Sequence, residues 1–255
     1  GAARLLQAME YPFAAWSSLP TSVSRQHAQQ FTARYGRPVR YIPNGVQLRP
    51  AVDLAAARSR LAAHGLPAGG YWLFAAGRIL PLKGAHLLLE ACRQVAAGQR
   101  LVIVGDLSPV PEYARQLLAL AGDQVTFIPF VSAPAELLGL IKLSSLFVFP
   151  SIQEGMSMML LEAASLGVPL LVSDIAANTE VMPGQVLHFQ SGNAADLGEK
   201  LRWARANPEQ MAAAGQAAQA HVAERYAWDV VAQQYEQAYL AALAAARRGP
   251  ALAAG

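Results

Sequence analysis

Residues 71–84 read YWLFAAGRILPLKG, and this segment determines how the rest of the chain is interpreted. Its first six residues are apolar and are followed by a glycine, a pattern typical of a strand buried on both faces of a sheet. Similar short apolar runs follow and end at Gly, Pro, Ser or Asp: 100–104, 125–128, 146–149, 168–172 and 186–189. The sequence therefore predicts a sheet of buried strands.

Amphipathic segments separate these runs and predict helices over about 84–97, 111–121, 133–143, 157–166 and 194–206. Strands that alternate with helices favour right-handed crossovers, so we expect an α/β fold with a doubly wound parallel sheet. Two Ala-rich segments at 208–224 and 228–246 predict two long C-terminal helices. Ligands in such sheets bind at the carboxyl ends of the strands, which directs attention to the loops that follow them.

The chain is expected to divide into three parts. Residues 1–44 combine helix and strand patterns, starting with a helix, as the end of an earlier αβ domain would, and the turn signal at 43–45 predicts a hinge. Residues 45–227 are expected to form the sheet domain, and 228–255 a last helix with a frayed end. The chain begins with Gly1 rather than Met, which predicts a cut or processed N-terminus.

The composition is that of a compact apolar protein. Hydrophobic residues make up 54% of the 255 residues and charged residues 15%, which argues against disorder. The net charge of +3 is scattered, and this distribution gives no indication of nucleic-acid binding. A single cysteine excludes an internal disulfide, and no apolar run reaches the length of a membrane span. We therefore expect a cytoplasmic protein, which could also lie on the inner face of the membrane.

Two basic residues bracket the loop after the first predicted strand. Arg78 and Lys83 are five positions apart between Gly77 and Gly84. An arginine fork and a lysine ammonium at this spacing can bind the two phosphates of a diphosphate through charge-assisted hydrogen bonds. The alternative is a solvated basic loop without a ligand.

A second group of candidate residues lies in 151–163, SIQEGMSMMLLEA. The predicted helix that starts near Ser157 is apolar nearly all round, so Glu162 inside it needs a partner such as a ribose diol. Glu154 precedes the helix, and Gly155 lets the backbone approach a ligand closely. The amides of Met156 and Ser157 lie at the positive end of the helix dipole, which suits an anion.

The alternative is that Glu162 pairs with a structural arginine and that Glu154 is a solvated loop charge. Both groups of residues follow strands of one predicted sheet, and this shared position favours a ligand site.

The order of these motifs resembles glycosyltransferase family 4. The resemblance rests on GRxxxxKG at 77–84, two glutamates with seven residues between them at 154 and 162, GxP at 167–169 and SD at 173–174. The segment PNGV at 43–46 is similar to the interdomain motif of that family. Tyr226 and Trp228, with the helix that follows, resemble the segment that crosses back to the N-terminal domain.

The resemblance implies the C-terminal, donor-binding half of a retaining glycosyltransferase with a GT-B, Rossmann-like fold. Arg78 and Lys83 would bind the diphosphate of a nucleotide sugar such as a UDP- or GDP-sugar. Glu154 would contact hydroxyl groups of the donor sugar, so these three residues are the expected catalytic residues. The family retains the anomeric configuration through front-face attack, in which the leaving diphosphate helps to deprotonate the acceptor.

The same resemblance assigns the rest of the nucleotide. Glu162 would hold the ribose, and the backbone of the loop at 129–132, which contains Val131, would contact the base. Gly155, Met156 and Ser157 would help Glu154 through their amides.

Three further expectations concern partners. No Asp-x-Asp motif occurs in the sequence, so neither a metal nor another cofactor is expected besides the donor substrate. The N-terminal domain that carries the acceptor site would have to complete the enzyme, so this chain by itself is expected to be inactive, and its exposed C-terminal helix could drive dimerisation. The alternative function is a non-catalytic nucleotide-sugar-binding subunit that needs a separate acceptor partner. The Arg/Lys loop with the glutamate pair favours a transferase over an epimerase of similar fold.

Overall fold

The computed structural model describes residues 12, 16–95 and 98–247, and the chain divides into two compact units. The larger unit consists of residues 46–224, and the smaller unit combines residues 1–45 with 225–255. The helix that the sequence predicts at the start of the chain lies outside the described residues. Both groups of candidate site residues belong to the larger unit.

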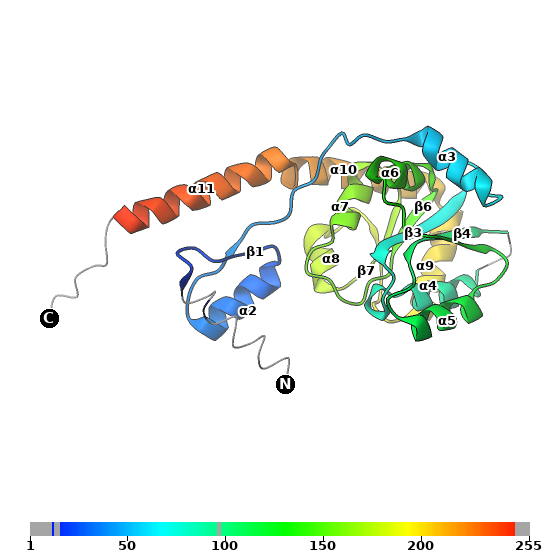
Figure 1. The fold of residues 1–255 in the computed structure, drawn as a ribbon, viewed down its shortest axis with the longest axis horizontal. Coiled ribbons are helices and arrows are strands. Elements are labelled where there is room, and N and C mark those ends of the chain that lie inside the picture. The colour runs from blue at the N-terminus through cyan, green and yellow to red at the C-terminus, as the bar shows by residue number, and fades with distance from the viewer. Residues whose placement is uncertain (1–11, 13–15, 96–97, 248–255) are drawn as a thin grey trace. The chain divides into compact units, whose positions relative to one another are not determined.

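A parallel six-stranded sheet forms the centre of the larger unit (Figure 1). Its strands are β3 (Tyr71–Arg78), β4 (Arg100–Asp106), β5 (Val125–Ile128), β6 (Leu146–Phe149), β7 (Leu170–Ser173) and β8 (Leu187–Phe189). The six predicted apolar runs are therefore strands, and the predicted α/β class is confirmed. The strand order is β5-β4-β3-β6-β7-β8, the doubly wound order in which the direction of winding reverses between β3 and β6.

Helices cover both faces of this sheet (Figure 1). They are α3 (Leu54–Ala63), α4 (Ala85–Cys92), α5 (Pro111–Leu120), α6 (Pro134–Leu143), α7 (Met158–Ser165), α8 (Ala176–Val181), α9 (Ala194–Ala206) and α10 (Pro208–Arg225), with a 3₁₀ turn η1 (Pro81–Lys83). The expectation of a helix over 84–97 is wrong at its end, because α4 stops at Cys92 and the amides of Gln94 and Val95 bond to carbonyls three residues back. Neither α3 nor α8 was predicted from the sequence.

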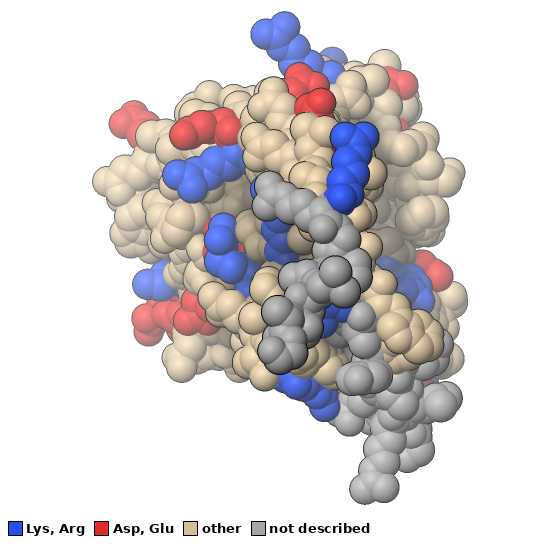
Figure 2. Space-filling view, turned by 90° about the vertical axis from the view of Figure 1, so that its left-hand side faces the viewer, with Lys and Arg blue, Asp and Glu red and all other residues tan. Residues whose placement is uncertain are grey.

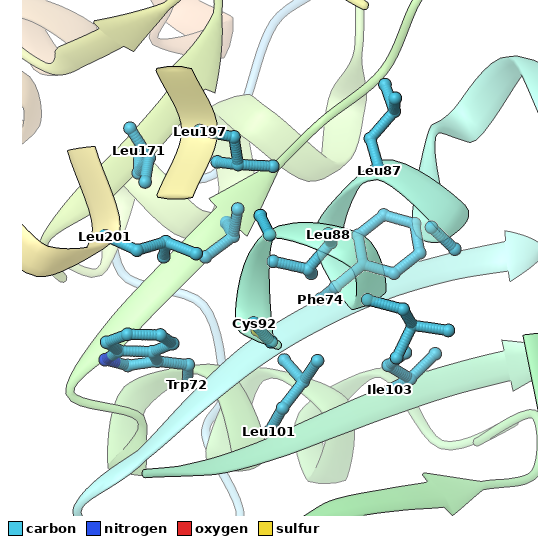
Figure 3. Packing of buried hydrophobic residues seen from close by; sticks show 14 of the residues in the cluster. Trp72, Phe74, Leu87, Leu88, Cys92, Leu101, Ile103, Leu171, Leu197 and Leu201 are labelled. Atoms are coloured by element: carbon cyan, nitrogen blue, oxygen red, sulfur yellow. The ribbon is translucent and has the colours of Figure 1, made fainter. Parts of the chain in front are cut away.

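Successive residues of β3 point to opposite faces of the sheet. Trp72 and Phe74 pack into a cluster with side chains of α4 and α9, including Leu88 and Leu201 (Figure 3). Tyr71 points to the other face, where its hydroxyl donates a hydrogen bond to a carbonyl of α6. Because every side chain of the first half of β3 is buried, the strand is fixed in register and its last residues are held at one edge of the sheet.

The smaller unit has its own arrangement. Its elements are β1 (Thr21–Ser22), α2 (Arg25–Tyr35), β2 (Arg40–Tyr41) and α11 (Trp228–Arg247), with the two strands paired in parallel. Ile42 packs with Val231 and Ala238 of α11 in a small buried cluster. Gly45 lies directly against the indole of Trp228, where a side chain at position 45 would collide with the ring.

Replacing Gly84 with alanine should destabilise the protein more than the same change at Gly65. Both glycines have positive φ angles, 72° and 67°, so each alanine adds about 1–2 kcal/mol of backbone strain. Only at Gly84 would the new Cβ meet another group, the carbonyl of Pro150, whereas the space at Gly65 is open. We expect Gly84→Ala to lower the free energy of unfolding by about 1–3 kcal/mol more than Gly65→Ala in urea titrations. Equal losses would contradict this close approach.

Candidate functional site

The candidate site lies where the winding of the sheet reverses. β3 and β6 are neighbours, with Trp72 opposite Leu146 and Leu73 opposite Phe147. Their crossover connections leave in opposite directions, and this opens a crevice at the carboxyl ends of the two strands. The predicted basic loop follows β3 and the predicted acidic loop follows β6. Topology therefore brings together two segments that are about 70 residues apart in the chain.

The two loops contact each other through their backbones. The amide of Ile152 donates a hydrogen bond of 2.8 Å to the carbonyl oxygen of Leu82. Next to it, Gly84 leaves just enough room for the backbone of Pro150. These contacts fix the end of η1 against the loop after β6, and the side chains that the loops carry are placed accordingly.

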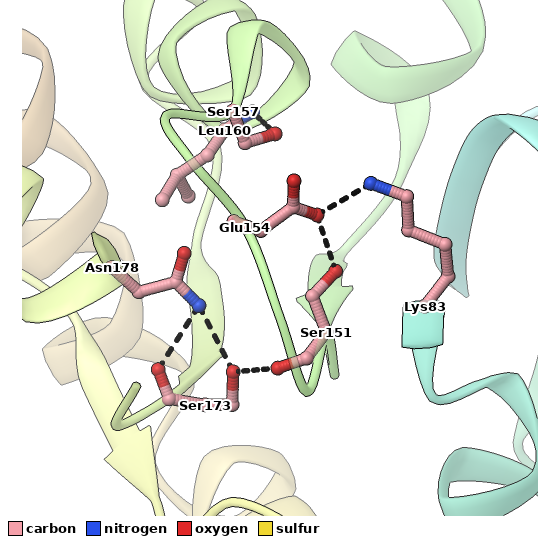
Figure 4. A network of polar contacts seen from close by, with 7 residues as sticks. All are labelled: Lys83, Ser151, Glu154, Ser157, Leu160, Ser173 and Asn178. Atoms are coloured by element: carbon pink, nitrogen blue, oxygen red, sulfur yellow. Dashed lines mark hydrogen bonds and ion pairs between the residues drawn. The ribbon is translucent and has the colours of Figure 1, made fainter. Parts of the chain in front are cut away.

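An ion pair joins the two predicted groups (Figure 4). The ammonium of Lys83 donates to Oε1 of Glu154 at 2.6 Å, and the hydroxyl of Ser151 donates to the same oxygen at 2.8 Å. The side chain of Glu154 is only 9% exposed and that of Lys83 is 24% exposed. Glu154 is therefore a held, largely buried carboxylate and not a solvated loop charge.

Arg78 lies at the end of β3 beside an irregularity in the strand pairing. From Ala75 to Arg78, β3 advances by three positions, while β4 advances by only two, from Val104 to Asp106. A bulge of this kind re-aims side chains, and bulges are frequent next to functional sites. The side chain of Arg78 is exposed and forms no ion pair or hydrogen bond with another described residue. It is therefore free to bind a ligand.

A cavity of about 240 Å³ opens between these loops. Its lining residues are Ala75, Ala76, Gly77, Arg78, Leu80, Lys83, Phe149, Ser157 and Met159. It brings together three of the predicted residues: Arg78, Lys83 and Ser157. Glu154 contacts this group through Lys83, and Gly155 follows it in the same loop.

The start of α7 forms one side of the site. Ser157 is the N-cap of α7, at the predicted start of the helix, and its hydroxyl accepts a hydrogen bond of 3.3 Å from the amide of Leu160. The hydroxyl thus serves the helix, while the first-turn amides that follow it lie at the positive end of the helix dipole. Met156, which precedes the N-cap, is buried.

Glu162 lies in α7 and is partly buried, but it is not part of the cavity lining. Burial raises the pKa of its carboxyl above the ordinary value. No described residue forms an ion pair or hydrogen bond with its side chain, so a structural arginine is not its partner among them. Val131 is likewise not part of the cavity lining. Its side chain is buried, whereas the ring of the preceding residue, Phe130, is exposed.

A larger cavity of about 560 Å³ lies elsewhere, at the amino ends of the strands. Trp72, Arg100 and Gln124 are among its lining residues. We assign the site to the smaller cavity because ligands of open α/β sheets bind at the carboxyl ends of strands. The smaller cavity also contains both predicted cations.

The sequence alone did not indicate three polar residues near the site. Ser151, Ser173 and Asn178 are almost fully buried and hydrogen-bonded in a chain that reaches Glu154 (Figure 4). Ser173 was part of the recognised motif without an assigned role, and Asn178 lies in the short helix α8, for which no helix was predicted. A polar residue four positions after the SD motif was the only available signal.

On the face shown in Figure 2, Lys and Arg side chains of the described residues are visible together with Asp and Glu side chains. Among the described helices, none has both the length and the hydropathy that a membrane crossing requires.

Replacing Glu162 with glutamine should stabilise the protein at about pH 8. Burial raises the pKa of Glu162 in the folded state, so the folded protein binds more protons than the unfolded chain and its stability falls as pH rises through that window. Glutamine removes this penalty. We expect the gain in unfolding free energy to disappear at about pH 3, where the carboxyl is largely protonated in both states.

Urea titrations at the two pH values measure this difference. Glu199→Gln, at an exposed position of α9, is the matched control and should change stability little at either pH. A loss of stability in Glu162→Gln at the higher pH would mean that the carboxylate has a structural partner.

Comparisons with known proteins bear on the same part of the chain. The family model described as "Glycosyl transferases group 1" matches residues 59–221. The D-inositol 3-phosphate glycosyltransferase of Segniliparus rotundus is 33% identical over 250 residues, which cover 91% of this chain and 53% of that protein. The enzyme of the same name from Streptomyces bingchenggensis is 31% identical, with 88% and 53% covered. The chain thus spans about half the length of the curated relatives it matches.

Solved structures share the fold. A glycosyltransferase of Rickettsia africae matches with a TM-score of 0.80 at 17% identity, covering 92% of this chain and 66% of that one. Anabaena HepE, solved in complex with UDP and glucose, matches with a TM-score of 0.75 at 20% identity, covering 88% and 64%. At these identities the similarity establishes the architecture.

Proposed function

Since this chain belongs to the glycosyl transferases group 1 family, we propose that it is the nucleotide-sugar-binding half of a retaining glycosyltransferase. One observation carries the proposal: Arg78, Lys83 and Glu154 meet at the point where the winding of the sheet reverses. Two cations beside a held carboxylate can bind an anionic donor while contacting its neutral sugar. The resemblance to family 4 supports the retaining class.

The diphosphate would occupy the cavity between the loops. Arg78 is exposed without a described partner and can offer its fork to one phosphate. Lys83 is already bound to Glu154, and its ammonium has further hydrogens for the second phosphate. The first-turn amides of α7 would add donors at the positive end of the helix. These side-chain cations would neutralise the charge of the leaving group, and the proposal needs no metal.

The rest of the donor would extend from this point. The second carboxylate oxygen of Glu154 could accept hydroxyl hydrogen bonds from the sugar, because Lys83 and Ser151 both donate to Oε1. Glu162, partly buried without a described partner, would accept from the ribose diol. The backbone of the loop at 129–132, with Val131, would contact the base.

The proposed reaction places an acceptor hydroxyl on the same face of the sugar as the leaving group. The bond from the acceptor oxygen to the anomeric carbon forms as the bond to the diphosphate oxygen breaks, and the acceptor proton passes to the departing diphosphate. Arg78 and Lys83 would stabilise the negative charge that develops on that group. Glu154 would orient the sugar, so the contribution of the protein is positioning and charge stabilisation.

Replacing Arg78 with alanine should weaken binding of UDP by about 1.5–3 kcal/mol, roughly 10- to 150-fold, with little change in stability. Replacing Lys83 should weaken UDP binding similarly but also lower the free energy of unfolding by about 1–3 kcal/mol, because Glu154 loses its partner. Calorimetry with and without EDTA and urea titrations measure the two effects. GDP should be tested beside UDP, since the base is not fixed by the proposal.

Arg58→Ala is the matched control, because Arg58 is an exposed arginine of α3 outside the cavity lining. It removes one positive charge and should leave nucleotide affinity within about twofold. If neither Arg78→Ala nor Lys83→Ala changes the affinity for UDP or GDP, the diphosphate assignment is wrong.

The chain by itself should bind a sugar nucleotide and transfer no sugar. Transfer needs an acceptor held close to the anomeric carbon, and this positioning supplies much of the rate enhancement. The curated relatives are about twice as long as the chain, so we propose that their remaining half supplies the acceptor wall. Radiolabelled sugar transfer to candidate acceptors should stay well below the roughly 1 per second of ordinary enzymes.

Adding the preceding half of a full-length relative as a separate domain should restore transfer if the chain is half of a single enzyme. A natural binding subunit would instead need a different acceptor partner, which is the alternative function.

Several large side chains of α11 are more than half exposed, namely Trp228, Tyr239, Leu240 and Leu243. We propose that the preceding half covers them and that, without it, they could drive dimerisation of the chain alone, which sedimentation experiments would detect. Full sugar transfer by such dimers would contradict the proposal.

A further inference from the structure

A chain of buried hydrogen bonds connects α8 to the candidate site (Figure 4). Asn178, on α8, donates to the hydroxyl of Ser173 at 2.9 Å and to the carbonyl oxygen of Ser173 at 3.1 Å. The hydroxyl of Ser173 donates to the carbonyl oxygen of Ser151. The hydroxyl of Ser151 in turn donates to Glu154 at 2.8 Å. All three polar residues before Glu154 are at most 1% exposed.

The donors and acceptors of this chain have fixed directions. A serine hydroxyl has one hydrogen, and that of Ser173 is used by the carbonyl of Ser151. Ser173 Oγ must therefore accept from its other partner, and the side-chain amide of Asn178 is a donor at that position. An acceptor in place of this amide would attract the Ser173 hydrogen and take it from Ser151.

We propose that Asn178 is a positioning residue that holds Glu154 in place for the donor sugar. Asn178 orients Ser173, Ser173 fixes the backbone of Ser151, and Ser151 directs the carboxylate of Glu154. A fully satisfied buried network of this kind specifies one arrangement of its members. The inference rests on the proposed function, because it gives Glu154 the role of binding the sugar and not the diphosphate.

The geometry favours this role over a purely local one. Holding α8 against β7 would need only the bond from Asn178 to the carbonyl of Ser173, since Ser173 is the last residue of that strand. The bond from Ser173 to Ser151 instead crosses to the loop after β6, which carries Glu154. The network thus connects α8, which follows β7, to Oε1 of Glu154 in the loop after β6.

Asn178→Asp tests the proposal, because the substitution keeps the shape of the side chain and replaces its donor with an acceptor. We expect the affinity for UDP-glucose to fall about tenfold while the affinity for UDP stays within about twofold. Ser173→Ala, which removes the same link without adding a charge, should shift the ratio of the two dissociation constants in the same direction. A structural role alone would lower both affinities together.

Asn207→Asp is the matched control. The side chain of Asn207 also donates to a backbone carbonyl, that of Trp203 at 2.8 Å, but at the end of α9 away from the cavity. It should leave the ratio unchanged. In a double-mutant cycle, Asn178→Asp and Ser151→Ala should be non-additive, because both act on Glu154 through one path.

Failure of this inference can be told apart from failure of the proposed function. If the unsubstituted chain binds neither UDP or GDP nor their glucose conjugates, the proposed donor class is wrong, and crystal structures of Asn178→Asp and Ser173→Ala then decide on the network. A displaced Glu154 carboxylate in these structures supports the positioning role. A carboxylate that keeps its contacts with Lys83 and Ser151, or equal losses for both ligands, overturns it.

Discussion

The contact between the loop after β3 and the loop after β6 is the constraint on which the site depends. The backbone bond from Ile152 to Leu82 and the close approach of Gly84 bring the loops together, and the pair Lys83–Glu154 then forms at 2.6 Å. Without this contact a largely buried carboxylate would have lost its charged partner, which is costly in a medium of low polarity. The site is thus a product of how two crossovers of the sheet pack.

The two cations of the site have different surroundings, so we propose different roles for them. Lys83 would be shared between Glu154 and a ligand in the cavity, and it would couple ligand binding to the stability of the fold. Arg78 ends a bulged strand and is exposed, so it would contact the ligand alone. On the other side, buried serines and Asn178 hold the carboxylate. Such a preorganised set of charges suits a reaction in which negative charge moves onto a leaving group.

The sheet and both loops could be predicted from the sequence, because strands buried on two faces leave continuous apolar runs and glycines mark the loops. The strand order and the ion pair between positions 71 residues apart could not, since both depend on tertiary packing. α3 was missed although Asp53 caps it, because its Ala-rich pattern has weak periodicity. Asn178 was missed because its importance comes from Ser173 and Ser151, which no local pattern places beside it.

The most direct test of the account is a crystal structure of the chain with UDP bound. We expect both phosphates within hydrogen-bonding distance of Arg78 and Lys83, over the carboxyl ends of β3 and β6, with the Lys83–Glu154 pair retained. The nucleoside should then extend toward Glu162. Density for UDP in the cavity lined by Trp72 and Arg100, at the amino ends of the strands, would contradict the account.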